Sequence, residues 1–292
     1  MAMLLIPLIP LLSVIRCSLM KQSSNGEIMV NIFAFNAVQN ISGVLLMLVI
    51  SGFTLRFHLP TFGYSIAYAV FYLVGMVSDY KALSSGPLAL TSLICSYAII
   101  IPCFYGLFFL GEDFGIIRVI SILLLLISML FINKKDDKAE EKVAKKGWPL
   151  YVCISFICNG GMLVINKMHQ THYPNQYQNE LVAYALSVAF VVFFVLTIIN
   201  SFIHKKKNSE EQKKTSAKVF YGVLAGICMA TMQYVCLFVA ARVDAMIMFP
   251  LDAIYGALFS VLASWFMFKE KFTALQIVGI CIGVLSVILL NI

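Results

Sequence analysis

LFFLGEDFGIIRVISILLLLISMLFIN (residues 107–133) and WFMFKEKFTALQIVGICIGVLSVILLN (residues 265–291) are two stretches of one chain that align without a gap. The offset is 158 residues, so Glu112 falls on Glu270 and Ser128 on Ser286. Nine of 52 positions between 82 and 133 are identical to their counterparts. Identity that low is weak evidence alone, so the prediction of a duplicated chain depends on the repeated spacing of its apolar segments.

Those apolar segments dominate the chain. Of its 292 residues 61% are hydrophobic and 12% are charged, which is too little polar surface to cover a soluble domain. A membrane-spanning helix needs roughly 20 mostly apolar residues. We therefore predict an all-α membrane protein with ten transmembrane helices, at about residues 2–20, 30–52, 62–80, 87–110, 115–132, 148–166, 180–202, 218–240, 244–267 and 272–291.

The predicted boundaries divide the chain into residues 1–133, a charged linker at 134–147, and residues 148–292, with five spans in each half. Five is odd, so the second half must enter the membrane upside down relative to the first. Inverted repeats are the usual construction of secondary transporters, because two similar halves of opposite orientation can exchange conformations around a central site. The pattern predicts transport by alternating access.

The basic residues are unevenly distributed among the loops. Sixteen of the 21 Lys and Arg follow the odd-numbered spans, mostly in the blocks 133–146 and 204–218. Basic loops stay cytoplasmic, so ten spans would place both termini on the other side of a plasma membrane. The blocks are diluted by acids and have few aromatic residues, so the net charge of +7 does not indicate nucleic-acid binding.

The two quoted stretches resemble the closing segments of EamA-type domains of the drug/metabolite transporter superfamily. The shared pattern is a Glu in a tight turn followed by the last helix of a repeat. Gly279 supplies the family's glycine in the second half, where Ser121 stands in the first. The resemblance implies two inverted five-helix repeats around a central cavity. Many such proteins are thought to keep both termini in the cytoplasm, and the lysine count here argues the reverse.

One carboxylate has no counterpart in the other half. Asp252 lies about eight residues into a predicted span, roughly 12 Å along a helix, and the matching residue is Ile94. A charge at that depth is costly and commonly functional. Asp252 could bind a cationic group of a solute or a coupling proton, could pair with Arg16 or Lys81, or could lie at the interface if the span begins later.

Other polar residues inside predicted spans are further candidates for contacts with a solute. Arg16 could reach the headgroups or hold a carboxylate or phosphate. Tyr255 is three residues from Asp252 and is repeated as Tyr97. The amide side chains, which could instead form helix–helix hydrogen bonds, are Asn36, Asn40, Asn159 and Gln233.

Two pairs of residues indicate structural roles. Glu112 and Glu270 each precede the last helix of a half, where a carboxylate can accept backbone N–H bonds and complement the helix dipole. Gly279 and Gly283 have the spacing of a close helix contact, either with the fifth span or with a second copy in a homodimer.

The function favoured by these features is a secondary transporter of a small organic metabolite, with an amino-acid-like solute preferred. The alternatives are efflux of lipophilic cationic drugs and a membrane subunit that transports nothing. We expect no metal, no cofactor and no enzymatic activity, because the sequence lacks a catalytic or metal-binding cluster, and it has no nucleotide-binding G-x-x-x-x-G-K-[ST] motif. The expected partners are the solute and the lipid bilayer.

Overall fold

Long apolar runs separated by short polar segments fold here as helices, since a helix satisfies its own backbone hydrogen bonds where water is absent. The computed structural model describes residues 2–24, 30–85, 94–95, 97–112, 115–132, 147–203, 212–268 and 274–290. These residues form ten α-helices and two short 3₁₀ helices without any strand, which confirms the all-helical prediction.

The helices follow the predicted spans closely. The first half contains the 3₁₀ helices η1 (Ala2–Leu5) and η2 (Tyr97–Ile99) and the α-helices α1 (Leu8–Ser24), α2 (Val30–Ile50), α3 (Leu59–Ser85), α5 (Ile100–Phe109) and α6 (Ile116–Ile132). The second half contains α7 (Trp148–His172), α8 (Gln178–Ile203), α9 (Gln212–Ala240), α10 (Ala245–Phe268) and α11 (Ala274–Leu290).

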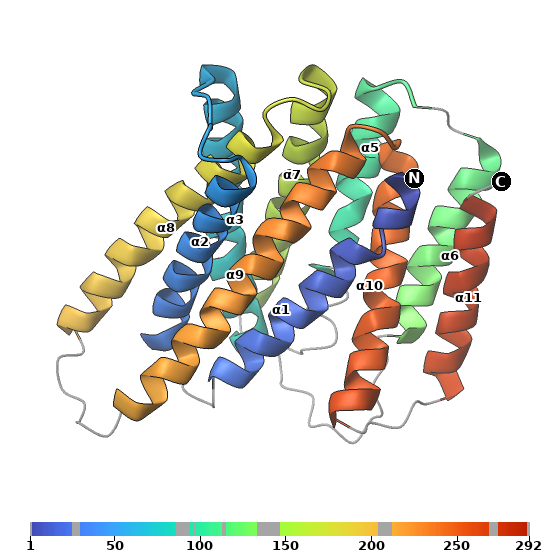
Figure 1. Cartoon of the computed structure of the whole chain (residues 1–292). Coiled ribbons are helices and arrows are strands. Elements are labelled where there is room, and N and C mark those ends of the chain that lie inside the picture. Colours follow the sequence, from blue (N-terminus) through green and yellow to red (C-terminus); the bar gives the residue numbers. More distant parts are fainter. Residues whose placement is uncertain are drawn as a thin grey trace.

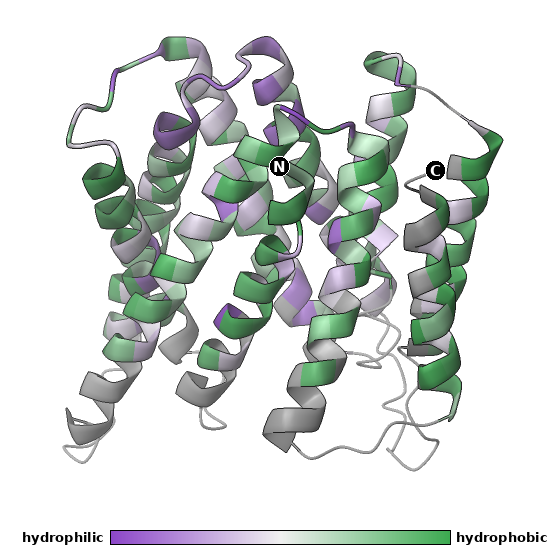
Figure 2. Ribbon diagram, turned by 45° about the vertical axis from the view of Figure 1, so that its right-hand side comes forward, coloured by the Kyte–Doolittle hydropathy of each residue, from purple (hydrophilic) through white to green (hydrophobic). Residues whose placement is uncertain are grey.

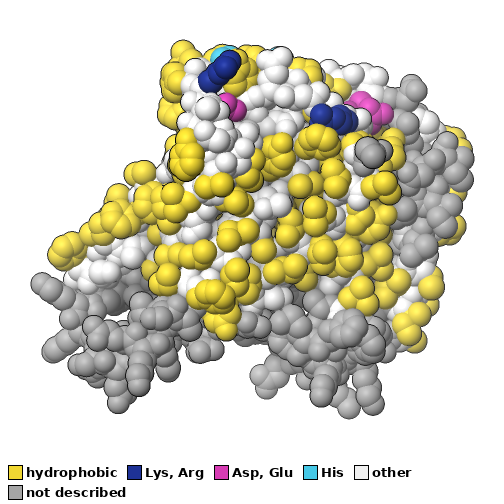
Figure 3. Space-filling view, in the orientation of Figure 1, with side chains coloured by type: hydrophobic (Ala, Val, Ile, Leu, Met, Phe, Trp, Pro, Cys, Tyr) yellow, Lys and Arg dark blue, Asp and Glu magenta, His cyan; other side chains and the backbone are white. Residues whose placement is uncertain are grey.

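Five of the described helices are long and apolar enough to cross a membrane, judged by length and composition. They are Phe33–Ile50, Leu59–Asp79, Trp148–His172, Gln178–Phe202 and Val219–Ala240. The other apolar helical stretches are shorter: Ala2–Arg16, Tyr97–Phe109, Val119–Ser128 and Ala245–Gly256. The face shown in Figure 3 is hydrophobic over most of its described area, with a few charged side chains near the end that carries the termini.

The helices form one bundle in which successive helices run in opposite directions (Figure 1). The chain ends lie at the same end of the bundle, and the helices joined by the two lysine-rich segments terminate at the opposite end (Figure 1). Helix α1 packs on α9, α3 on α7, and α2 on both α8 and α9. Helices α6 and α11 pack on each other at one edge of the bundle (Figure 1).

Glycines allow the closest of these crossings. A Cβ atom on Gly226 of α9 would lie 2.2 Å from the backbone oxygen of Gln39 in α2. On Gly160 of α7 it would lie 2.4 Å from Ile101 of α5. Both glycines lie inside continuous helices, so they serve here as packing notches.

The glycine face of α11 is covered within the molecule. Ser128 of α6 donates a hydrogen bond to the backbone oxygen of Gly279 (2.7 Å), and a Cβ on Gly283 would lie 2.8 Å from the Ser128 hydroxyl oxygen. Of the two partners expected for Gly279 and Gly283, the structure has the fifth span, and that face is not open for a homodimer.

Candidate functional site

Polar side chains of four helices meet in the middle of the bundle. On α3, Tyr68 and Tyr72 are four residues apart and so lie on the same helix face. The Tyr72 hydroxyl donates to Asn36 Oδ1 of α2 (3.4 Å) and accepts from Gln39 Nε2 (3.3 Å). Gln39 Nε2 also lies 2.9 Å from the sulfur of Met229 in α9.

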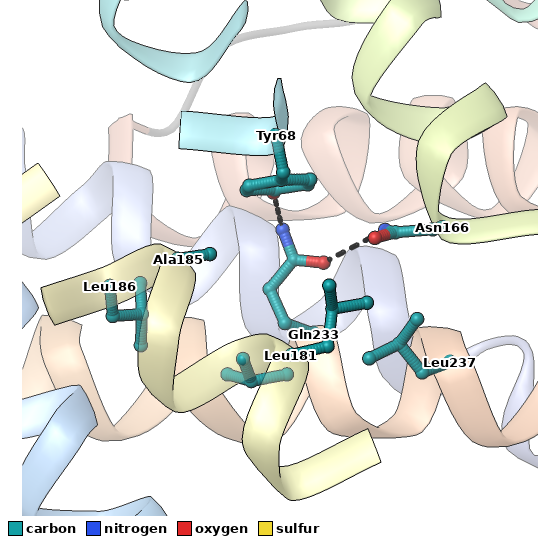
Figure 4. A pocket seen from close by; sticks show the side chains of 8 residues that line it. Tyr68, Asn166, Leu181, Ala185, Leu186, Gln233 and Leu237 are labelled. Atoms are coloured by element: carbon teal, nitrogen blue, oxygen red, sulfur yellow. Dashed lines mark hydrogen bonds between the residues drawn. The ribbon is translucent and has the colours of Figure 1, made fainter. Parts of the chain in front are cut away.

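A second group of bonds continues from Tyr68. Gln233 of α9 donates its amide hydrogen to the Tyr68 hydroxyl, and Asn166 of α7 donates to Gln233 Oε1 at 3.2 Å (Figure 4). Asn166 also donates to the sulfur of Cys236 at 3.7 Å. Leucine and alanine side chains of α8 and α9 form the rest of this pocket, which has room for about one water molecule.

We call the two groups together the central polar lane: Asn36, Gln39, Tyr68, Tyr72, Asn166 and Gln233. Figure 2 shows hydrophilic stretches on helices in the middle of the bundle, whereas the outermost helices are mainly hydrophobic over their described lengths. Buried polar groups normally pair with one another. The lane satisfies most of its members internally, but Gln39 Oε1 is buried without a hydrogen-bond partner.

Two ionisable side chains lie within electrostatic range of the lane or of its hydrogen-bond partner Cys236. Arg16 of α1 interacts electrostatically with Tyr68 and Tyr72, and Asp252 of α10 interacts with Cys236. Arg16 Nε and Asp252 Oδ1 are both buried and have no hydrogen-bond partner. No ion pair joins Arg16 to Asp252 among the described residues, and Lys81 lies over the ring of Tyr151 at 5.2 Å. The lane therefore borders a cation and an anion that each keep a buried, unsatisfied atom.

Of the remaining predicted contacts, Tyr97 and Tyr255 lie outside the lane, and Asn40 lies beside it, next to Tyr72. The Tyr97 hydroxyl donates to the backbone oxygen of Leu126 in α6 (2.9 Å), so it ties η2 to α6 instead of entering the lane. Tyr255 stacks on Phe259 along its own helix, with ring centroids 6.4 Å apart. Asn40 donates to the backbone oxygen of Asn36 (2.7 Å), and its Oδ1 is buried without a partner.

Glu112 and Lys167 form a buried ion pair at the end of the bundle that carries the termini. Lys167 Nζ lies 3.3 Å from Glu112 Oε1, and the two side chains are 8% and 7% exposed. The carboxylate accepts N–H bonds from Ala245 (2.8 Å) and Met246 (3.0 Å). Glu112 thus caps the N-terminus of α10, in the other half of the chain, and not the helix that follows it in sequence. Glu270 is outside the described residues.

Two charged residues inside the bundle, Lys167, which is buried, and Asp79, which is partly buried, were not singled out from the sequence. Lys167 directly follows the predicted span 148–166, but it is buried in α7 and donates to the backbone oxygens of Val243 (2.6 Å) and Ala240 (3.3 Å). Asp79, near the end of a predicted span, accepts a bond from Asn159 of α7 (3.4 Å). One feature of the sequence indicates a position for Asp79 inside the bundle. Asp79 follows Tyr68 by eleven residues, so the two side chains lie on the same helix face.

No group of three or more His, Cys, Asp or Glu among the described residues could hold a metal ion. The bundle of apolar helices with a polar interior is the architecture of a polytopic membrane protein. Its polar groups can bind and orient a small molecule.

Comparison with known proteins agrees with this architecture. The model of the EamA-like transporter family matches residues 146–292, half of the chain, and the protein belongs to that family. It is therefore a membrane transporter of small solutes, in a family of transporters and not of enzymes. A solved crystal structure has the same fold, with a TM-score of 0.72 at 14% identity over 99% of this chain and 97% of that chain. No curated protein matches the sequence.

Proposed function

We propose that the protein is a secondary transporter that moves an amino-acid-like solute by alternating access. The observation that carries this proposal is the central polar lane with Arg16 and Asp252 beside it. Two opposite charges with unsatisfied buried atoms are costly inside an apolar bundle unless a ligand or an altered conformation pairs them.

The chemistry of the lane suits a zwitterion. An arginine offers several donors in a plane to a carboxylate, and an aspartate accepts from an ammonium group. The amides and phenols between them can bind polar atoms of either kind. Efflux of lipophilic cations is less favoured as the main activity, because a cationic solute would have to bind next to the positive charge of Arg16.

Reciprocal contacts between α6 and α11 support an inverted repeat. Ser128 donates to the backbone oxygen of Gly279, and Ser286 donates to that of Ser121, each at 2.7 Å. At the offset of 158, Ser128 corresponds to Ser286 and Ser121 corresponds to Gly279. The two hydrogen bonds therefore join equivalent positions of the two halves, with donor and acceptor halves exchanged. Such reciprocity is the mark of a two-fold axis.

The helix pairs follow the same rule. Packing of α1 on α9 corresponds to packing of α7 on α3, since α1 and α7 begin the two halves and α3 and α9 are their third predicted spans. The matched residues 146–292 also coincide with the expected second repeat, 148–292. An odd number of spans in each half then gives the halves opposite orientations in the membrane.

The lane must open for a solute to enter. The pocket between Tyr68 and Gln233 holds about one water molecule, and the Glu112–Lys167 pair joins α7 to the α9–α10 connection at one end. This arrangement corresponds to a state closed on the side of the termini. By the charge rule the lysine-rich end faces the cytoplasm, so we place the closed end outside, in a plasma membrane.

The test is solute counterflow with the purified protein in liposomes. Vesicles are loaded with a mixture of unlabelled amino acids, and entry of single radiolabelled amino acids is measured. Loss of a charge-assisted hydrogen bond costs about 1.5–3 kcal/mol. We expect Arg16→Gln to raise the KM for the carried solute about 10- to 100-fold.

The matched control is Arg242→Gln, because Arg242 is exposed and covers the ring of Phe238 at 3.5 Å. Asp252→Asn should lose affinity for amino acids but not for their deaminated acids. Full activity of both Arg16→Gln and Asp252→Asn would discard this site. Uptake of lipophilic cations alone would favour drug efflux, and absence of any counterflow would reject the proposed transport function.

A further inference from the structure

A second polar cluster lies between α3 and α7. Asp79 Oδ1 accepts hydrogen bonds from the Ser155 hydroxyl, from Asn159 Nδ2 (3.4 Å) and from the Cys95 thiol (3.7 Å). Ser155 is fully buried, and its oxygen also lies 3.2 Å from Asn159 Nδ2 and 3.0 Å from the Cys95 sulfur. We call these four residues the Asp79 cluster.

The groups that face this carboxylate in the described part of the chain are neutral. Besides Cys95, the thiol of Cys158 in α7 interacts electrostatically with it. Lys81 follows two residues later on α3 and has its Nζ over the ring of Tyr151, and no salt bridge to Asp79 occurs among the described residues. Hydrogen-bond donors stabilise an ionised carboxylate, but they leave its negative charge uncompensated.

The cluster is continuous with the central polar lane. Tyr68, Tyr72 and Asp79 stand at i, i+4 and i+11 on one face of α3. Asn159 of the cluster and Asn166 of the lane are seven residues apart on α7, which is also one face. The two helices touch between these groups, where a Cβ on Gly75 would lie 3.0 Å from the Cβ of Cys158.

The cluster lies toward the end opposite the Glu112–Lys167 pair. Ser155 is seven residues from the start of α7, about 10 Å along the helix, and α7 starts at the lysine-rich end (Figure 1). Asp79 is only partly buried, and its Oδ1 makes all three bonds, so Oδ2 remains available to a proton from that side.

We propose that Asp79 is the proton-binding residue that couples transport to a proton gradient. The proposal rests on the proposed transport function. In each cycle the carboxylate takes up one proton at one side of the membrane, becomes neutral and releases that proton at the other side. A sodium ion fits this cluster less well, because the hydrogen atoms of Ser155 and Asn159 already point at the carboxylate oxygen, and the Cys95 thiol is a soft ligand.

The first experiment compares exchange with gradient-driven uptake in liposomes. The assay uses radiolabelled members of the amino-acid mixture and the variant Asp79→Asn, which has nearly the same shape and cannot titrate. We expect counterflow within twofold of the wild type and at least a tenfold loss of accumulation driven by a pH gradient. The matched control is Glu180→Gln, because Glu180 accepts a bond from the backbone of Arg56 at the far end of the bundle.

A smaller change tests the hydrogen bonds themselves. Ser155→Ala removes one donor to the ionised carboxylate, so half-maximal coupling should shift to higher pH by about one unit. The control Ser187→Ala removes a hydroxyl that bonds within its own helix, to the backbone oxygen of Ala183 at 2.7 Å, and should shift nothing. Equal pH profiles for Ser155→Ala and the wild type would overturn the assignment.

A second readout does not depend on transport. Dicyclohexylcarbodiimide reacts with protonated carboxyl groups in apolar surroundings, and mass spectrometry locates the adduct. We expect an adduct on Asp79 that decreases as pH rises from 5 to 9. Absence of this adduct at every pH would overturn the proposal, even if counterflow succeeds.

The same adduct without any counterflow would keep the proton site and reject the transport function. Accumulation driven by a sodium gradient at equal pH on both sides, and not by a pH gradient, would also overturn the proposal.

Discussion

Removing the positive charge of Lys167 should destabilise the protein more than any other single charge removal in the described part of the bundle. In Lys167→Met the Glu112 carboxylate keeps its two N–H donors but loses its counter-ion, and two backbone oxygens of the α9–α10 connection lose a donor. Both side chains of the pair are nearly fully buried, so water cannot replace the lost partner.

The expected loss of stability follows from the burial of the ion pair. Breaking a buried ion pair on one side costs about 3–5 kcal/mol, because an uncompensated charge stays behind. One kcal/mol shifts the melting temperature of a large domain by about 2–4 °C, so the loss is roughly 6–20 °C. The double variant Glu112→Gln, Lys167→Met removes both charges and should recover part of the loss, since residues in direct contact do not behave additively.

The assay is thermal unfolding of the purified variants in one detergent, followed by helical circular dichroism and by labelling of the buried Cys103. Arg242→Met is the matched control, because that cation is exposed, and it should shift the melting temperature by less than 2 °C. The reasoning would be refuted if Lys167→Met melted like the control, or if the double variant lost the full sum of the single effects.

Three further predictions concern packing and orientation. Gly226→Ala places a methyl group 2.2 Å from the Gln39 backbone oxygen and should lower the free energy of unfolding by about 1–3 kcal/mol. Gly63→Ala, where a methyl group would meet no atom within 4 Å, should stabilise helix α3 by up to about 1 kcal/mol in the same melting assay. Ser128→Ala and Ser286→Ala should each cost about 1 kcal/mol and agree within about 0.5, and a clear inequality would argue against the two-fold relation. In a variant without other cysteines, one cysteine added after the last residue should react with a membrane-impermeant maleimide outside intact cells, and reaction only after lysis would reverse the predicted orientation.

The spans could be predicted from the sequence because the cost of placing a residue in hydrocarbon is largely a local property. The ten described helices lie where apolar runs were found, with ends shifted by a few residues except in the predicted span 87–110, where the described α-helix α5 begins only at Ile100. The glycine contact of α11 with α6 was also one of two stated alternatives. Neither result required knowledge of which helices are neighbours.

The site was harder to predict because it depends on those neighbours. Arg16 and Asp252 stood out as charges in spans, and both adjoin the lane. Tyr97 was selected for its repeat partner, but its hydroxyl binds α6. Lysine is a residue type expected in a loop or at a helix end. Lys167 is buried beside Glu112 only because the α5–α6 turn packs against α7.

Lys167 and Asp79 have no charged equivalents in the other half, whereas Glu112 is matched by Glu270. At the offset of 158, Lys167 matches Ile9 and Asp79 matches Leu237. In the proposed alternating-access cycle, two halves with the same helix arrangement would exchange conformations at no net cost, so unmatched groups such as these would set the difference in free energy between the two states. The Glu112–Lys167 pair can close only the end that carries the termini. An offset of about 2.7 kcal/mol corresponds to a ratio of roughly 99 to 1. Binding of the solute, or of a proton near the opposite end, would then have to supply that difference for the closed end to open.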